Sequence, residues 1–203
     1  MTTEFDAAFW DRMYQHRHGA WDGEPNGFLA EQTADLAPGA ALDLGCGEGA
    51  DALWLASRGW RVTAVDLSGV ALAHAREADT TQAVSWLQAD MFAWEPPVEA
   101  FDLISLHYVH VPPGSRAALF GRLARAMRPG GTLLVVAHHP SDHETDLGRP
   151  AIADLYFTAD EVAAMLPEDW EVLVSGTKPQ TVTKGEGKSL TIQDMVFKAR
   201  RRA

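Results

Sequence analysis

The sequence predicts an α/β fold in which helices cover both faces of a doubly wound, mainly parallel sheet. Short apolar runs alternate with segments of helical periodicity along the 203 residues, and this alternation is typical of βαβ units. We find no internal repeat, low-complexity tract or linker rich in proline and glycine that would divide the chain. We therefore expect one domain, with residues 1–37 as a helical N-terminal arm and residues 38–203 as the core that carries the sheet.

Five apolar runs are expected to form the parallel strands. Each is nearly continuous in apolar residues, as expected for strands that are covered on both faces. The runs are residues 41–44, 61–66, 84–89, 101–106 and 132–137. Helices are expected at 48–58, at 68–78 and 115–127 with serine N-caps, and from 158, where a capping-box pattern begins.

The C-terminal part has a different pattern. Residues 171–176 and 191–199 are strand-like, and no long helical pattern separates them. The segment between them, residues 177–190, is rich in lysine, glycine and threonine, which predicts a long hairpin loop. The sheet should therefore end in an antiparallel pair instead of another crossover helix.

Composition and charge exclude several classes of partner. The formal net charge is −11, and basic residues cluster only at 198–203, so the chain lacks the cationic surface that nucleic-acid binding needs. No apolar run approaches the roughly 20 residues of a membrane span. The acidic N-terminus lacks a secretory signal pattern, and the single cysteine, Cys46, fits a reducing compartment. We expect a cytoplasmic protein without a nucleic-acid or membrane partner; its oligomeric state is unknown.

A glycine-rich turn follows the first predicted strand. Gly45, Gly47 and Gly49 allow a sharp turn and the close approach of a ligand or helix. Asp43 lies inside the strand, where an unpaired carboxylate is costly to bury, and a ligand ammonium would explain its position. A dinucleotide pyrophosphate would be repelled by Asp43 and Glu48. The alternative is a tight strand–helix turn without a ligand.

Two further acids end the next two strands. Asp66, followed by Leu67, comes 21 positions after Gly45, close to the spacing that places a carboxylate on a ribose diol. The alternative for Asp66 is a helix N-cap. Asp90 can accept a hydrogen bond from an adenine amine, while Met91, followed by Phe92, offers a backbone amide and an apolar wall; the alternative for Asp90 is an acid in a loop.

The ordered series of these motifs resembles that of class I S-adenosylmethionine-dependent methyltransferases. The similar segments are residues 42–49, 65–68, 89–92, 101–104 and 127–133. The resemblance implies a Rossmann-like, seven-stranded sheet whose last strand is antiparallel, with S-adenosyl-L-methionine as the cofactor. It implies that the three glycines line the methionine part, Asp66 binds ribose, Asp90 and Met91 hold adenine, and His107 contacts the cofactor. Leu67 and Phe92 are included in this predicted site.

The N-terminal arm carries two kinds of aromatic residue. Phe9, Trp10, Met13 and Tyr14 fall at helical spacing, which favours packing against the core, although Trp10 is also a candidate cofactor contact. Trp21 lies among glycine, aspartate, proline and asparagine, as expected for a loop. This arm is similar to the N-terminal lid of the tellurite-resistance and thiopurine-type branch of small-molecule methyltransferases, so we expect Trp21 to close over the cofactor.

Histidines cluster where a methyl acceptor would bind. His107 and His110 follow the fourth strand, and His138, His139 and His143 follow the fifth, so both groups lie at the ligand side of the sheet. An imidazole there can act as a general base, and His107, His110 and His139 are the candidates. A metal site in the second group is the alternative, but no firm ligand spacing supports it, and we expect no metal.

These observations favour an S-adenosylmethionine-dependent methyltransferase that acts on the sulfur, nitrogen or oxygen of a small molecule. An NAD(P)-dependent oxidoreductase is disfavoured by the acids beside the glycine turn and by the hairpin-like C-terminus. Methylation of a nucleic-acid base is disfavoured because Val111-Pro-Pro-Gly lacks the acid or amide and the aromatic residue of the usual signature. A protein that binds the cofactor without catalysis would carry the same motifs, so only turnover separates it.

Overall fold

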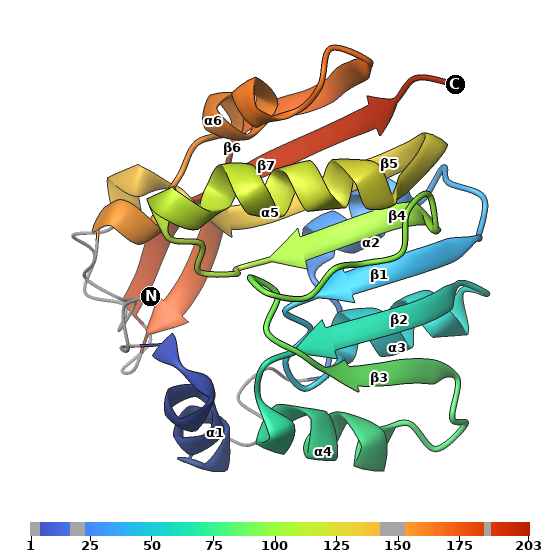
Figure 1. Ribbon diagram of the computed structural model, residues 1–203. Coiled ribbons are helices and arrows are strands. Elements are labelled where there is room, and N and C mark those ends of the chain that lie inside the picture. Colours follow the sequence, from blue (N-terminus) through green and yellow to red (C-terminus); the bar gives the residue numbers. More distant parts are fainter. Residues whose placement is uncertain (1–4, 17–22, 143–152, 185–187) are drawn as a thin grey trace.

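A computed structural model describes residues 5–16, 23–142, 153–184 and 188–203, which form one α/β unit around a single sheet (Figure 1). The strands are β1 (Ala40–Leu44), β2 (Arg61–Asp66), β3 (Val84–Gln88), β4 (Phe101–His107), β5 (Met127–His138), β6 (Trp170–Lys184) and β7 (Lys188–Arg201). The helices are α1 (Ala7–His16), α2 (Gly27–Thr33), α3 (Ala50–Ser57), α4 (Gly69–Ala78), α5 (Pro113–Ala126) and α6 (Ala159–Met165). Two short 3₁₀ turns, η2 (Pro140–Asp142) and η3 (Ala153–Leu155), follow β5.

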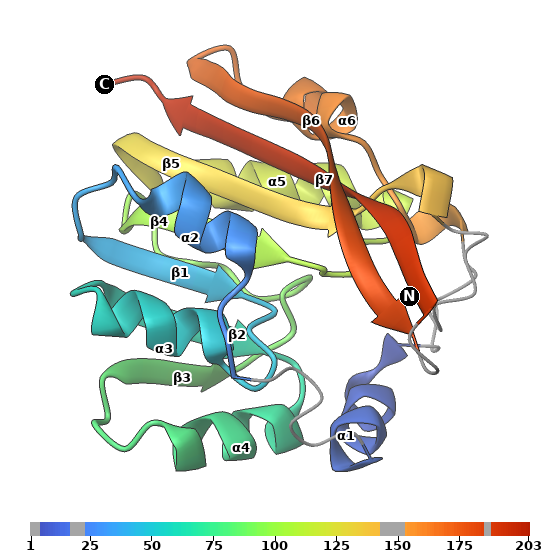
Figure 2. The same cartoon turned by 180° about the vertical axis from the view of Figure 1, so that it is seen from behind.

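The sheet has seven strands in the order β3-β2-β1-β4-β5-β7-β6. The pairs from β3 to β5 are parallel, whereas β7 is antiparallel to both of its neighbours. Helices α5 and α6 lie on the face seen in Figure 1, and the view from behind in Figure 2 shows α2 and α3 on the other face. The predicted doubly wound fold with an antiparallel last strand is confirmed.

The hydrophobic core has two parts, one on each face of the sheet. Leu42 and Ile104 belong to the part that also holds residues of α5 and α6, whereas Ala41 and Leu103 belong to the part that holds residues of α3. Neighbouring residues of a strand thus reach opposite faces, as the pleat requires. Because both faces are packed, the carboxyl ends of the central strands are held rigidly.

The predicted hairpin loop at residues 177–190 is wrong for most of this segment. Strands β6 and β7 continue through much of this segment, and their pairing runs from Trp170 opposite Arg201 to Lys184 opposite Lys188. The hairpin extends beyond the rest of the sheet (Figure 2), and residues 177–179 are exposed. In a two-stranded ribbon exposed to solvent, the backbone N–H and C=O groups are satisfied by pairing between the strands, and no apolar side chains are needed. The amino-acid composition of this segment therefore resembles that of a loop.

Two smaller predictions also need correction. β3 is one of the two edge strands, and its residue Leu87 is 38% exposed instead of buried. Ser115 is not an N-cap, because α5 begins at Pro113, whose ring is already compatible with the first helical turn. The predicted N-cap at Ser68 and the capping box from Thr158 are both confirmed.

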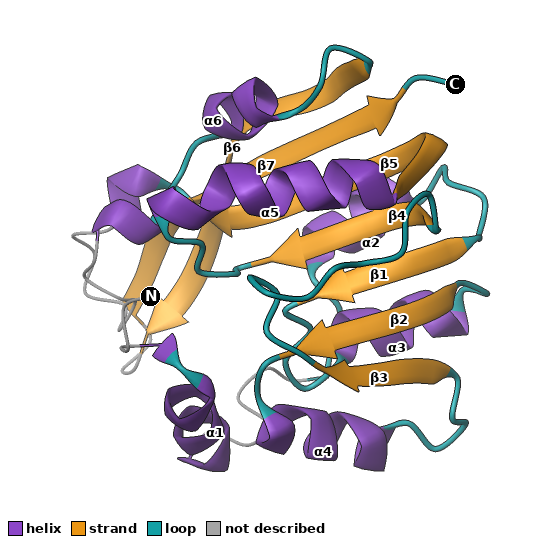
Figure 3. Cartoon of the chain, viewed as in Figure 1, coloured by secondary structure: helices purple, strands orange, loops and turns teal. Residues whose placement is uncertain are grey.

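The carboxyl ends of β1, β2, β3 and β4 meet at one edge of the sheet. The loops that follow these strands leave the sheet there (Figure 3), and α1 packs beside α4 at the same edge. In open α/β sheets, ligands bind outside the carboxyl ends of the strands. The fold thus brings the sequence motifs together at this edge.

Candidate active site

The glycine turn has a backbone that side chains would strain. Gly45, Gly47 and Gly49 have φ angles of +76°, +52° and +85°. A Cβ at Gly45 would overlap the side chain of Val109, and one at Gly49 would overlap the ring of Trp86. Gly45 thus allows close packing of Val109 against the turn, and Gly49 allows close packing against β3.

Asp66 ties the glycine turn to α4. Its Oδ2 accepts a hydrogen bond from the Gly47 N–H at 2.8 Å, and its Oδ1 accepts one from the Ser68 N–H at 2.8 Å. The helix N-cap is Ser68, whose Oγ accepts from Ala71 and donates to Asp11 at 2.6 Å. Burial raises the pKa of Asp66. A carboxylate oxygen can accept more than one hydrogen bond, so Asp66 can also accept hydrogen bonds from the hydroxyl groups of a ligand.

Asp43 is a buried carboxyl group with one oxygen unsatisfied. Its Oδ1 accepts a hydrogen bond from the Ser105 hydroxyl at 3.2 Å, while its Oδ2 is buried without a partner among the described residues. Burial raises the pKa of Asp43 to about 7, and the nearby Asp51 carboxylate acts in the same direction. A cation bound beside this oxygen would satisfy it and favour the ionised form.

His107 belongs to the same acidic group. Its Nδ1 lies 2.5 Å from Asp51 Oδ2, and Asp51 Oδ1 accepts the Asn26 N–H at 2.6 Å. The His107 Nε2 is buried without a partner in the part of the chain that the structure describes. The contact that we predicted between His107 and the cofactor would therefore lie on the same side of the site as Asp43. Asp51 was missed, although an acid in the first turn of a helix directly after a glycine turn was a usable signal.

The third strand-end motif lies close to the glycine turn. Asp90 Oδ1 accepts the Phe92 N–H at 2.8 Å, which closes the turn, and Arg122 Nη2 donates to the carbonyls of Met91 and Phe92 at 3.0 and 3.1 Å. The methyl group of Met91 lies beside Gly45. Leu67, the other predicted neighbour, is half-buried. These residues form a wall next to the glycine turn.

The N-terminal arm lies over this edge at two points. Of the predicted apolar stripe, only Tyr14 is buried; its hydroxyl lies over Gly47, and burial raises its pKa, so it stays protonated. Trp10 stacks on His110 with ring centroids 5.5 Å apart and planes at 19°. Trp10 thus lies beside the loop after β4 and next to Tyr14, and its predicted contact with the cofactor stays a prediction. Trp21 lies outside the described residues.

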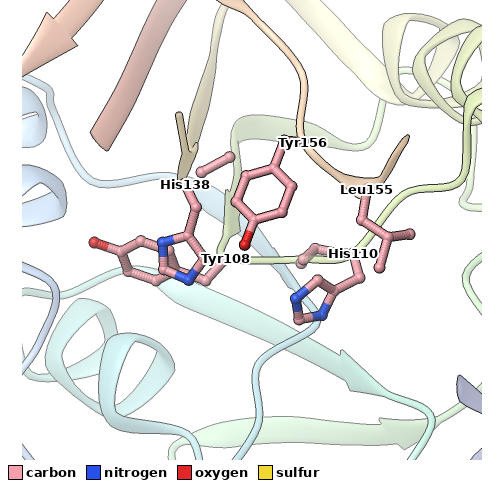
Figure 4. Close-up of a pocket in the computed structure, with 7 residues that line it drawn as sticks. Tyr108, His110, His138, Leu155 and Tyr156 are labelled. Atoms are coloured by element: carbon pink, nitrogen blue, oxygen red, sulfur yellow. The ribbon is translucent and has the colours of Figure 1, made fainter. Parts of the chain in front are cut away.

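A small pocket opens next to the glycine turn, over the ends of β4 and β5 (Figure 4). Its lining residues are Tyr108, Val109, His110, Ala137, His138, Leu155 and Tyr156. None of these lining residues is an acid, a lysine or an arginine. Burial, and to a smaller extent His138, lower the pKa of His110 to about 4, so this ring is neutral at pH 7. The pocket is therefore mainly aromatic and uncharged.

The predicted histidines are divided by the structure. His110 lines the pocket, whereas His107 faces the acids beyond β1. His139 is not among the lining residues; its Nδ1 lies 2.9 Å from the Ser141 hydroxyl. His138, which was not among the candidates for general base, does line the pocket. His143 lies outside the described residues.

The part of the chain that the structure describes contains no group of three or more histidine, cysteine, aspartate or glutamate side chains placed to hold a metal ion. None of its helices has the length and hydropathy required to cross a membrane.

Comparison with known proteins agrees with the fold and the motifs. Residues 41–131 match the methyltransferase domain family. The sheet order, with its antiparallel last strand, is that of class I methyltransferases. The chain has the fold of class I S-adenosylmethionine-dependent methyltransferases, and it is similar to the methyltransferase domain family over residues 41–131.

Its relatives include two proteins of Arabidopsis thaliana. The chain is 30% identical to a probable thiol methyltransferase 2 over 67% of its own length and 64% of the relative's. It is 27% identical to thiocyanate methyltransferase 1 over 88% of its own length and 80% of the relative's. The chain thus spans a little less than two thirds of the first relative.

Two solved structures are similar over almost the whole chain. One comes from work on the conversion of a disulfide bond into a thioacetal group during echinomycin biosynthesis; it has a TM-score of 0.77 and 25% identity, over 97% of this chain and 93% of that one. TehB from Haemophilus influenzae has a TM-score of 0.74 and 21% identity, over 95% of this chain and 67% of that one. The likeness to TehB shows the fold.

Proposed function

We propose that this protein transfers the methyl group of S-adenosylmethionine to the sulfur of a small thiol that carries no carboxylate. The observation that carries the proposal is the position of Val109. Its side chain lies against Gly45 of the glycine turn and also lines the aromatic pocket. A cofactor on the turn and an acceptor in the pocket would therefore be immediate neighbours, as methyl transfer between them requires.

The residues around the glycine turn fit S-adenosylmethionine. The unsatisfied, buried Asp43 Oδ2 suits the ammonium of the methionine part, and a phosphate group would be repelled there. Asp66 lies at a strand end, where its carboxylate can accept hydrogen bonds from ribose hydroxyls. Asp90 lies at the next strand end, where its carboxylate can accept a hydrogen bond from the adenine amine beside Met91. When bound, the sulfonium supplies an activated methyl group, so the protein has mainly to position the acceptor.

The pocket favours an acceptor without carboxylates. An acceptor with several carboxylates would require arginine or lysine, and the lining residues include neither. The rings of Tyr108, His138 and Tyr156 suit an apolar or aromatic molecule with a polarisable sulfur. The names of the two Arabidopsis relatives refer to thiol and thiocyanate, which supports sulfur as the acceptor atom.

Turnover of thiols tests the proposal. Purified protein is mixed with S-adenosylmethionine and benzyl mercaptan, 4-nitrothiophenol, phenol or aniline, and release of S-adenosylhomocysteine is followed with mass detection of the methylated product. We expect methylation of the thiols at a kcat/KM at least tenfold above that of phenol or aniline. Preferential methylation of phenol or aniline would assign a different acceptor atom. Binding of the donor without turnover of any acceptor would instead favour the non-catalytic alternative.

A further inference from the structure

An acidic residue in strand β7 lies directly before a run of buried apolar residues. Asp194 is completely buried and precedes Met195, Val196 and Phe197, which are also buried. Burial of a carboxylate is expensive unless hydrogen bonds or charges compensate it. An acid at this position therefore needs a reason that packing does not provide.

Two residues of the pocket meet this carboxylate. The Tyr108 hydroxyl donates a hydrogen bond to Asp194 Oδ2 at 2.9 Å. His138 lies directly opposite Asp194 in the β5–β7 pairing, and its Nδ1 is 3.5 Å from Asp194 Oδ1. The second distance is longer than a well-formed hydrogen bond, as is common for catalytic pairs before substrate binds.

The backbone of Tyr108 is strained to make this arrangement. Its φ angle is +54°, which is uncommon for a large side chain, and its N–H donates to the Val136 carbonyl at 2.8 Å. The ring lies 4.6 Å from that of His138. Strain of this kind persists where the surroundings fix it, and it is concentrated at functional sites.

We propose that His138 accepts the proton of the acceptor thiol, and that Asp194 and Tyr108 are positioning residues that hold its ring. The inference rests on the proposed function and deepens it. With its proton on Nδ1, which lies 3.5 Å from Asp194 Oδ1, His138 keeps the lone pair of Nε2 for the pocket, where its ring lies beside Tyr108 and Tyr156 (Figure 4).

The step balances without another reactant. A sulfur lone pair of the acceptor forms the new bond to the methyl carbon, and the bond from that carbon to the donor sulfur breaks with its electron pair left on the donor. The thiol proton moves to His138 Nε2, so the positive charge of the donor ends on the imidazolium. Asp194 stabilises that charge, and the proton then passes to water.

His110 is a poorer candidate for this role. Its ring packs against both Phe5 and Trp10, at centroid distances of 5.8 and 5.5 Å, and its Nδ1 is buried without a partner among the described residues. Nothing in that environment stabilises an imidazolium. Among the described residues, the groups near His138 are Asp194, Tyr108, Tyr156 and the neutral His110. Asp194 is the one acid in this group, and it is the residue that we propose holds the His138 ring.

Two thiols of similar size test the role of His138. Benzyl mercaptan is protonated at pH 7 and needs a base, whereas 4-nitrothiophenol is already ionised and does not. We expect His138→Gln to lower kcat/KM for benzyl mercaptan by about 100-fold or more, and that for 4-nitrothiophenol by less than threefold. His16→Gln, at the exposed end of α1, is the matched control and should change neither value. An equal loss on both thiols, or no loss on either, would overturn the inference.

A second measurement needs neither donor nor acceptor. In protein labelled with ¹⁵N-histidine, the nitrogen shifts of unligated His138 should show the tautomer with its proton on Nδ1. Asp194→Asn should abolish that preference, and Tyr108→Phe should weaken it. A proton on Nε2 in the native protein, or no response to Asp194→Asn, would contradict the proposal. If the wild type methylates neither thiol, the proposed function fails, and these spectra still decide whether Asp194 holds His138.

Discussion

Replacement of Asp43 by asparagine should stabilise the ligand-free protein in a pH-dependent way. The carboxyl group is buried and its pKa is raised from 3.8 to about 7, so the folded state binds this proton more tightly than the unfolded chain does. Stability should therefore fall as the pH rises from about 4 to about 7, and then level off. At 1.36 kcal/mol per pH unit, the cost of ionising Asp43 grows by about 3 kcal/mol between pH 5 and pH 8.

Urea denaturation of the ligand-free protein measures this difference. The free energy of unfolding of Asp43→Asn minus that of the wild type should be about 3 kcal/mol larger at pH 8 than at pH 5. Asp102→Asn is the matched control, because Asp102 is partly exposed and paired with the Ala40 N–H and Arg128; its effect should be the same at both pH values. A difference for Asp43→Asn that does not change with pH would refute the reasoning.

Three further predictions concern the turn, the arm and the loop after β3. Gly49→Ala should destabilise the fold by about 2 to 4 kcal/mol in urea denaturation, because φ is positive at this position and the added Cβ overlaps an indole ring. Gly114→Ala is the control; a Cβ at Gly114 meets no other atom, so this change should be nearly neutral. Trp10→Ala should raise the KM for benzyl mercaptan roughly tenfold and change the Kd of S-adenosylhomocysteine less than twofold; the reverse pattern would place Trp10 in the cofactor site. Arg122→Met should weaken S-adenosylhomocysteine binding about tenfold in calorimetry, because two hydrogen bonds to the loop are lost, and the exposed Arg125→Met should not.

The cofactor side of the site was predictable because its signals are local. A glycine turn directly after a buried strand, and acids such as Asp66 and Asp90 at the ends of the next strands, are fixed by short-range spacing. Parallel strands bring such residues to one edge of a sheet whatever the rest of the chain does. The structure places these motifs together. It also shows that Gly49 is required by packing, which spacing alone did not distinguish from ligand approach.

The pocket was not predictable, because distant segments build it. The hydrogen bond between Tyr108 and Asp194 joins residues 86 positions apart, and His138 meets Asp194 only through the β5–β7 register. Sequence reasoning located the histidine-rich loops but selected His139 as a candidate instead of its neighbour His138. Asp194 directly before the apolar Met195, Val196 and Phe197 was a usable signal, yet the predicted hairpin loop, which is largely strand, obscured how β7 pairs.

Calorimetric titration of the wild-type protein with S-adenosylhomocysteine tests the central claim, which is that the glycine turn and the strand-end acids hold a sulfonium nucleoside. We predict one binding site per chain, with no heat from NAD⁺ under the same conditions. Binding of NAD⁺ without binding of S-adenosylhomocysteine would contradict the account.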